Sequence, residues 1–151
     1  MTQKIFIGAD HRGFELKTHL IEWLRQSSYQ VVDLGAHELD STDDYPDFAF
    51  AVGEAVAKEA GLGVVICGSS IGVTIAANKV KGVRAASACD ELGVVHGRER
   101  DGLNVLALAA DEVELDKAKK MVQRFLTTKP INAPRFVRRV EKIKQYENTH
   151  H

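Results

Sequence analysis

The sequence predicts an α/β fold, a three-layer doubly wound (Rossmann-like) sandwich in which a five-stranded parallel sheet carries helices on both faces. Short apolar runs alternate five times with longer segments of helical spacing along the 151 residues, which is the order of successive βαβ units. The runs are apolar throughout and do not alternate with polar residues, as is typical of parallel strands buried on both faces. Right-handed crossovers between such strands produce the doubly wound arrangement.

Each predicted strand is a short apolar run, and each of the first three is followed by a glycine within two residues. The run at 62–66 is the most continuous, because only Gly63 interrupts its aliphatic side chains. An acidic stretch at 36–47 carries Pro46, and we expect a loop there. In chain order, the strands are expected at 5–7, 31–34, 62–66, 83–88 and 103–108.

Between these runs, apolar residues recur at the three- and four-residue spacing of helices that cover a sheet. The helices are expected near 14–24, 48–56, 75–77, 91–100, 113–125 and 136–146. Pro130 and Pro134 break the chain before the last helix, whose pattern at 136–146 is expected to lie within outer bounds of about 134–147. The sequence contains no internal repeat or linker, so residues 1–151 are expected to form a single domain.

The composition excludes several classes of protein. Lys and Arg number 20 against 21 Asp and Glu, a formal net charge of −1, so bulk charge does not favour nucleic acid or an anionic membrane as a partner. No apolar run approaches the roughly 20 residues of a membrane span, and the run at 5–7 is too short for a signal peptide. Cys67 and Cys89 fit neither a disulfide framework nor a four-ligand zinc site. We therefore expect a cytoplasmic protein with reduced thiols.

Ligands bind outside the carboxyl ends of the strands in open parallel sheets. Applied to this chain, the rule selects three segments as candidates for a functional site. The first strand leads into residues 10–13, the third leads into residues 67–72, and residues 100–102 precede the fifth.

The segment 67–72 (Cys-Gly-Ser-Ser-Ile-Gly) is the most informative of the three. Small residues between a strand and a helix let backbone N–H groups converge on an anion, which is a phosphate, a carboxylate or an oxyanion formed during a reaction. The segment matches neither a Walker loop nor GxGxxG, so a nucleotide is disfavoured. Cys67 is either a thiolate that acts as nucleophile or base, or a small buried hydrophobe. Cys89 has no glycine loop beside it and is expected to be structural.

Two further pairs have both a functional and a structural interpretation. Asp10 and His11 can exchange protons or contact an anion; alternatively, Asp10 caps a helix and His11 is solvated in its first turn. Arg135 and Arg139 are four residues apart and therefore on one face of the last helix. They either clamp a phosphate or belong to a solvated basic face.

A series of short motifs extends from Ile5 to Tyr146. The motifs are Gly-Ala-Asp-His-Arg-Gly (8–13), Asp-Tyr-Pro-Asp (44–47), Ile-Cys-Gly-Ser-Ser-Ile-Gly (66–72), Ile-Ala-Ala-Asn-Lys (75–79), Gly-Val-Arg-Ala (82–85), Asn-Val-Leu-Ala (104–107) and the Arg135/Arg139 pair. In this order, the set resembles the family of type B ribose-5-phosphate isomerases and the related galactose-6-phosphate isomerase subunits.

The resemblance implies a reversible aldose–ketose isomerisation of a phosphorylated sugar, with ribose 5-phosphate and ribulose 5-phosphate as the first expectation. It also implies that the reaction needs no metal or organic cofactor. The enzyme would be a homodimer with shared active sites, or a tetramer, in which the C-terminal helix reaches toward the partner subunit.

The same resemblance implies roles for individual residues. Cys67 would be the base that moves a proton between C1 and C2 through a cis-enediolate, with Ser69 near the sugar oxygens and Asp10 beside them. Backbone N–H groups of residues 68–72 would stabilise the enediolate, and Arg135 and Arg139 would hold the phosphate. The residues implied to bind the substrate are His11, Tyr45, Gly68, Ser70, Ile71, Gly72, Arg100, Asp101, Arg135 and Arg139.

Some positions depart from the family's pattern. Arg100 and Asp101 stand where the family usually has His-Asn, which is thought to assist opening of the sugar ring. Asp111 replaces a common phosphate-binding arginine after the fifth strand. Val73 stands where some relatives have a glutamate base, which leaves Cys67 as the candidate. Two smaller departures are Ser70 in place of a glycine and Phe136 in place of a frequent histidine.

These departures leave the substrate open. A tetrose 4-phosphate cannot close a furanose ring, because its O4 is esterified, and it therefore needs no ring opening. We keep a tetrose 4-phosphate, a hexose 6-phosphate and a non-catalytic subunit that completes a partner's site as alternatives to ribose 5-phosphate isomerase. A nucleotide-binding regulatory module is a further alternative that rests on the fold alone.

Overall fold

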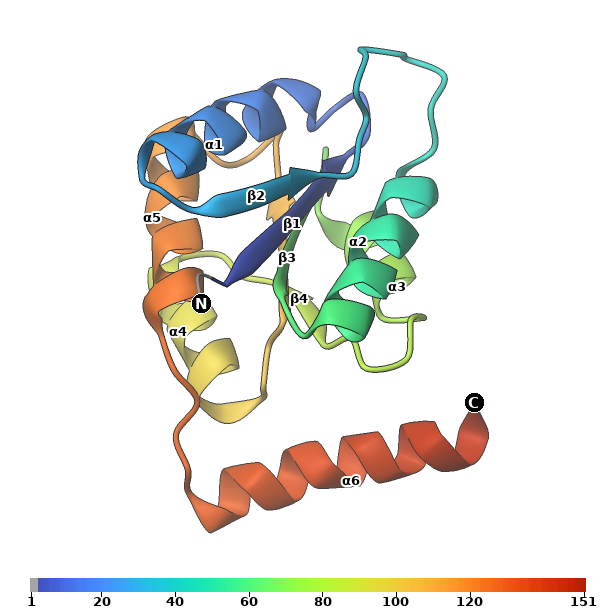
Figure 1. Cartoon of the computed structure of the whole chain (residues 1–151), viewed down its shortest axis with the longest axis vertical. Helices are drawn as coiled ribbons and strands as arrows, with labels where there is room; N and C mark the ends of the chain where they lie inside the picture. The colour runs from blue at the N-terminus through green and yellow to red at the C-terminus, as the bar shows by residue number, and fades with distance from the viewer. Residues whose placement is uncertain (1–2) are drawn as a thin grey trace.

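The structure, a computed structural model, describes residues 3–151 and contains a five-stranded sheet whose strands are all parallel. The strand order is β2-β1-β3-β5-β4, and helices cover both faces (Figure 1). This confirms the predicted doubly wound sandwich. The strand order reverses between β1 and β3, and such a switch point places a crevice at the carboxyl ends of these two strands.

The elements follow one another in the predicted order. The strands are β1 (Lys4–Ala9), β2 (Gln30–Asp33), β3 (Leu62–Cys67), β4 (Ala85–Ser87) and β5 (Val105–Ala109). The helices are α1 (Phe14–Gln26), α2 (Tyr45–Glu59), α3 (Ile71–Ala77), α4 (Glu91–Arg100), α5 (Leu115–Thr127) and α6 (Pro134–His150).

The side chains of the central strand β3 divide between two hydrophobic cores. All six residues of β3 are buried, and alternation along the strand turns successive side chains to opposite faces. Val64 and Ile66 pack in the core beneath α1, α4 and α5, whereas Val65 and Cys67 pack in the core beneath α2 and α3. Figure 1 shows these two groups of helices on opposite sides of the sheet. Cys67, the last residue of β3, therefore faces the layer formed by α2 and α3.

The strand β4 is shorter than the predicted run at 83–88, because side chains replace the ladder around it. The Arg84 N–H donates to Asn104 Oδ1 at 2.7 Å, just before the strand begins. The side-chain amide of Asn78 bonds both the N–H and the C=O of Ala85, each at 2.8 Å. The backbone N–H and C=O of Ala85, at the edge of the sheet, are thus already hydrogen-bonded, which limits pairing with another strand.

The strand β5 begins two residues later than the predicted 103, because the backbone N–H of Leu103 bonds back to the preceding helix and not to a strand. The Leu103 N–H donates to the Gly97 carbonyl in α4 at 3.0 Å. The ladder with β3 starts at Val105, which lies opposite Gly63.

A buried lysine connects α1 to the segment that follows β2. Lys17 is 2% exposed, and its Nζ donates to Asp33 Oδ1 and to the Ala36 carbonyl, both at 2.7 Å. A buried ammonium group requires such partners, because removing it from water is costly. The contact fixes the start of the long loop that leads to α2.

The last helix, α6, begins as predicted at residue 134 but continues to His150. Phe136 is its buried residue, whereas Val137, Ile143 and Tyr146 are exposed apolar side chains. In Figure 1, α6 crosses below the rest of the molecule, on the side from which the parallel strands start. Within residues 3–151, no helix has the length and apolar character needed to cross a membrane.

Candidate active site

The loop between β3 and α3 is tied to the end of β5. The Ala110 N–H donates to the Cys67 carbonyl at 2.9 Å, and the Asp111 N–H donates to the Gly68 carbonyl at 3.1 Å. Ser70, which precedes α3, has a φ of 67° in the left-handed region. The loop turns sharply there and directs the chain from the strand into the helix.

This loop presents backbone N–H groups that the folded chain does not use. Among the described residues, the N–H groups of Gly68, Ser69 and Ser70 donate to no protein acceptor, whereas the Ile71 N–H donates to Ser69 Oγ at 3.3 Å. Unpaired N–H groups at a strand–helix junction favour an anionic ligand. The Ile71 side chain is exposed and the Ser70 side chain is buried, so these two predicted residues contribute to the loop mainly through their backbone.

The carboxylate of Asp10 shapes the turn after β1. Asp10 is 5% exposed, and its Oδ1 accepts hydrogen bonds from the N–H groups of Arg12 and Gly13, at 3.0 and 3.1 Å. The N-cap of α1 is Gly13, without a side-chain hydrogen bond. The carboxylate of Asp10 therefore stabilises the turn that precedes α1, and the interpretation of Asp10 as the N-cap of this helix is wrong.

The ring of Tyr45 packs on the start of α3. A Cβ added to Gly72 would lie 2.6–2.9 Å from three carbons of the Tyr45 ring, so the close contact requires glycine. Tyr45 is the first residue of α2, and its ring closes one side of a cavity.

This cavity lies at the carboxyl ends of β1 and β3 and has a volume of about 200 Å³. It brings together six of the predicted site residues, from three separate segments of the chain. The lining residues are Asp10, Arg12, Tyr45, Cys67, Gly68, Ser69, Gly72 and Asp111. Arg12 and Asp111 are the two members of this set that the sequence did not predict as site residues, and they form an ion pair.

His11 contacts the acidic loop that precedes α2. Its Nδ1 lies 2.7 Å from Asp43 Oδ1, which also accepts the His11 backbone N–H at 3.0 Å. Asp43 was not predicted from the sequence, and its Oδ2 is buried without a hydrogen-bond partner among the described residues. Donor atoms of Asp10, His11 and Asp43 lie within 4.8 Å of one another, but hydrogen bonds already account for the arrangement of these groups.

Hydrogen bonds also stabilise a second carboxylate of this loop. The hydroxyl of Thr42 and then its backbone N–H lower the pKa of Asp40, and the nearby His11 lowers it further. The loop therefore carries negative charge beside His11.

Arg100 and Asp101 do not lie at the carboxyl edge of the sheet, so grouping them with the other two segments was wrong. They end α4 and lead into β5, and residues that precede a parallel strand lie at its amino end. The guanidinium carbons of Arg100 and Arg135 lie 6.0 and 4.6 Å from the centre of the Phe136 ring. Within one chain, Arg100 therefore lies beside the start of α6, the helix that also carries Arg135 and Arg139. None of these three arginines lines the Cys67 cavity among the described residues.

Cys89 is exposed, in contrast to Cys67, which is buried. The expectation that Cys89 has a structural role is therefore not supported by packing. It follows β4 in the segment that leads to α4, outside both hydrophobic cores.

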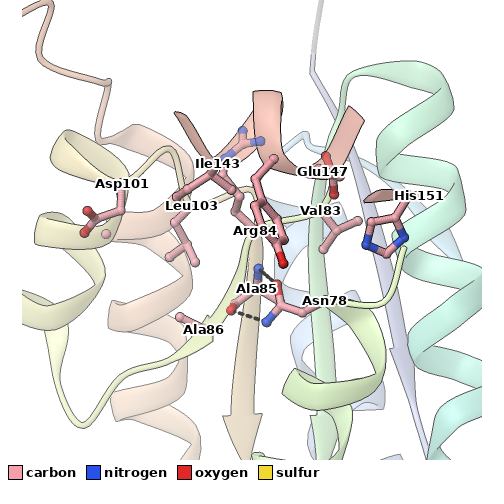
Figure 2. A pocket seen from close by; sticks show the side chains of 12 residues that line it. Asn78, Val83, Arg84, Ala85, Ala86, Asp101, Leu103, Ile143, Glu147 and His151 are labelled. Carbon is pink, nitrogen blue, oxygen red and sulfur yellow. Dashed lines mark hydrogen bonds between the residues drawn. The ribbon is translucent and has the colours of Figure 1, made fainter. Parts of the chain in front are cut away.

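A second cavity, of about 400 Å³, lies between α6 and β4 (Figure 2). Its apolar wall includes Val83, Leu103 and Ile143, and Arg84 crosses it to donate from Nε to the Gly102 carbonyl at 2.7 Å. Burial lowers the pKa of Arg84, whereas glutamates of α6 oppose that shift. Among the described residues, none of the 67–72 loop lines this cavity, so the chemistry that we consider belongs to the smaller cavity.

A doubly wound sheet with a thiol, a hydroxyl and unpaired N–H groups at the end of its central strand defines an α/β enzyme that acts on a small anionic substrate. The family model described as Ribose/Galactose Isomerase matches residues 5–143. The chain belongs to this family, and it is an aldose–ketose isomerase of the sugar-phosphate class.

Individual relatives extend the similarity over nearly the whole chain. A probable ribose-5-phosphate isomerase B of Mycoplasma genitalium is 43% identical over 97% of this chain and 97% of its own length. Ribose-5-phosphate isomerase B of Mycobacterium tuberculosis is 37% identical over 97% of this chain and 91% of its own.

Solved structures give the same result for the fold. Ribose-5-phosphate isomerase B of Mycoplasma genitalium, with bound ribulose-5-phosphate, superposes with a TM-score of 0.93 at 43% identity, over 98% of both chains. The type B ribose 5-phosphate isomerase of Trypanosoma cruzi has a TM-score of 0.94 at 35% identity, over the full length of both chains.

Proposed function

We propose that this isomerase interconverts ribose 5-phosphate and ribulose 5-phosphate, with Cys67 as the base. The observation that carries the proposal is that Cys67 lines the same cavity as Asp10 and Ser69. The relative with bound ribulose-5-phosphate supports this choice of substrate, because it covers 98% of the chain.

The reaction begins with the open-chain aldose. The thiolate of Cys67 takes the proton from C2, the electrons of that C–H bond form a C1=C2 double bond, and the C1 oxygen becomes an oxyanion. A proton then passes from the C2 oxygen to the C1 oxygen, near Ser69. The Cys67 thiol finally returns its proton to C1, which produces the ketose and restores the thiolate.

The loop after β3 supports the charged intermediate. The N–H groups of Gly68, Ser69 and Ser70 have no acceptor within residues 3–151, so they can donate to the oxygens of the cis-enediolate. One such donor typically lowers the barrier by about 3 kcal/mol. The proposed chemistry uses no metal or organic cofactor, because the proton moves between adjacent carbons of one molecule.

The proposed active site combines two copies of the chain. Arg135 and Arg139 are exposed on α6, whereas the Cys67 cavity of the same chain is lined by other segments. In a homodimer, or a tetramer built from it, the partner's α6 would supply the arginines that hold the phosphate. We keep the cytoplasm as the proposed location, since Cys67 must stay reduced to act as a base.

A specific observation keeps a tetrose 4-phosphate as a second candidate. Arg100 lies over the Phe136 ring, and a guanidinium does not exchange protons near neutral pH. It therefore cannot assist ring opening as an imidazole does, and a tetrose 4-phosphate needs no such assistance. A hexose 6-phosphate and a non-catalytic subunit of such an enzyme are the remaining alternatives.

The test is an isomerisation assay of the purified protein with tetrose, pentose and hexose phosphates. We expect turnover of ribose 5-phosphate, and Cys67→Ala should abolish exchange of the C2 proton with solvent while the unfolding midpoint stays near that of the unmodified chain. Exchange at the unmodified rate in Cys67→Ala would remove Cys67 from the role of base. Activity with the tetrose alone would favour the second candidate, and no turnover of any sugar phosphate would favour a non-catalytic subunit.

A further inference from the structure

An ion pair crosses the mouth of the Cys67 cavity. The guanidinium of Arg12, in the turn after β1, contacts the carboxylate of Asp111, which follows β5. The two residues are 99 positions apart in the chain. Their side chains are 56% and 48% exposed, so both are open to a ligand that enters the cavity.

The backbone holds both residues of the pair in place. The Arg12 N–H donates to Asp10 Oδ1 at 3.0 Å, and the Asp111 N–H donates to the Gly68 carbonyl at 3.1 Å. A Cβ added to Gly68 would lie 2.6 Å from Arg12 Nε and 2.8 Å from Asp111 Oδ2. The guanidinium therefore lies directly over the loop that presents the unpaired N–H groups.

Charge distinguishes Arg12 from the other residues of the cavity. The lining contains the carboxylates of Asp10 and Asp111, and Arg12 is its one Lys or Arg among the described residues. An intermediate that gains negative charge would be repelled by these carboxylates if no cation were beside it. An exposed ion pair contributes little to stability, so folding alone does not account for the placement of this pair.

We propose that Arg12 contacts the substrate and stabilises the negative charge that forms on the sugar oxygens during isomerisation, and that Asp111 holds its guanidinium over Gly68. This inference rests on the proposed function, because it assumes that the enediolate forms beside Cys67. In this arrangement Arg12 is a catalytic residue that acts with the N–H groups of the loop, and Asp111 is a positioning residue.

The experiment compares the unmodified enzyme with Arg12→Gln, Arg12→Lys and Asp111→Asn, using the best substrate of the sugar-phosphate panel. Loss of a donor to the developing oxyanion should reduce kcat in Arg12→Gln by roughly tenfold or more, with a smaller change in KM. Arg12→Lys should recover part of this loss, because it retains a positive charge. The fall in kcat should be smaller in Asp111→Asn than in Arg12→Gln, because the guanidinium is still present.

The chain offers a matched control in another exposed ion pair. Arg124 Nε lies 3.2 Å from Glu91 Oε2, with side chains 59% and 40% exposed, and neither residue lines the Cys67 cavity among the described residues. Arg124→Gln should therefore leave kcat and KM unchanged. A second measurement uses Arg12→Ala with added guanidinium ion, which should restore part of kcat, whereas sodium chloride at the same ionic strength should not.

The outcomes distinguish failure of this inference from failure of the proposed function. If the unmodified enzyme isomerises a sugar phosphate but Arg12→Gln keeps its kcat, or changes only KM, the inference is wrong and the proposed function stands. If kcat falls equally in Arg12→Gln and Asp111→Asn, and the unfolding midpoint falls equally as well, the pair has only a structural role. If the unmodified protein turns over no sugar phosphate, it is the proposed function that fails.

Discussion

One residue of the loop between β3 and α3 has a strained backbone conformation that also shapes the candidate site. Ser70 adopts a φ of 67°, a conformation that costs a residue with a Cβ about 1 kcal/mol relative to glycine. The conformation turns the chain so that Ile71 begins α3, and the N–H groups of residues 68–70 have no partner in the described part of the chain. The strain is therefore associated with the part of the loop that we propose binds the enediolate.

The first prediction concerns this residue. Ser70→Gly should raise the free energy of unfolding by about 0.5–1 kcal/mol, because glycine adopts positive φ without steric cost. Urea denaturation of the unmodified chain and of the variant would measure the difference. A loss of stability would show that contacts of the buried Ser70 side chain outweigh the backbone strain.

At the scale of elements, the connection between α1 and β2 depends on a buried charge. Lys17 donates to Asp33 and to the Ala36 carbonyl, and these contacts position the chain as it leaves the sheet. Because the loop from 36 to 44 then carries Asp43 to His11, this connection also affects one border of the candidate site. The sequence indicates the loop, but it does not show that a lysine within α1 anchors it.

The second prediction tests this anchor. Asp33→Ala should lower the free energy of unfolding by about 2–4 kcal/mol, since it leaves the Lys17 ammonium buried with one neutral acceptor. The double variant Lys17→Met with Asp33→Ala should recover much of that loss, because no buried charge remains. Urea denaturation provides both values, and equal stability of the single and double variants would contradict the explanation.

In the whole molecule, the proposed binding residues lie in two separate regions. Cys67, Ser69 and Asp10 meet at the carboxyl edge of the sheet, whereas Arg100, Arg135 and Arg139 lie on the side of α6. A single chain therefore cannot bring both groups to one sugar phosphate in this structure. The proposed homodimer would join the groups across its interface, with α6 of each copy at the site of the other.

The third prediction follows from shared active sites. Cys67→Ala and Arg139→Gln should each be nearly inactive when purified separately. Mixed in equal amounts under conditions that allow subunit exchange, they should regain roughly a quarter of the activity, because half of the dimers are then mixed and each contains one intact site. Sites formed within one chain would contain a defect in every copy, and mixing would then restore no activity.

The sequence alone was sufficient for the architecture, because strands and helices are encoded by local periodicity. Continuous apolar runs predicted five parallel strands, and the small residues at 67–72 predicted an anion-binding loop. The prediction from the sequence was less accurate at the edge strand β4, because Asn78 and Asn104 replace ladder contacts there with side-chain hydrogen bonds. Such contacts depend on residues that are distant in the chain and leave no periodic signal.

Only the tertiary structure decided which charged groups meet. Arg12 joins Asp111 and His11 joins Asp43 through folding of segments 99 and 32 residues apart, and polar side chains on loops carry no pattern that identifies their partners. The fold also placed Arg100 at the opposite edge of the sheet from Cys67. The physical reason is that apolar periodicity specifies layers, whereas the position of an individual charge depends on how the layers are connected in space.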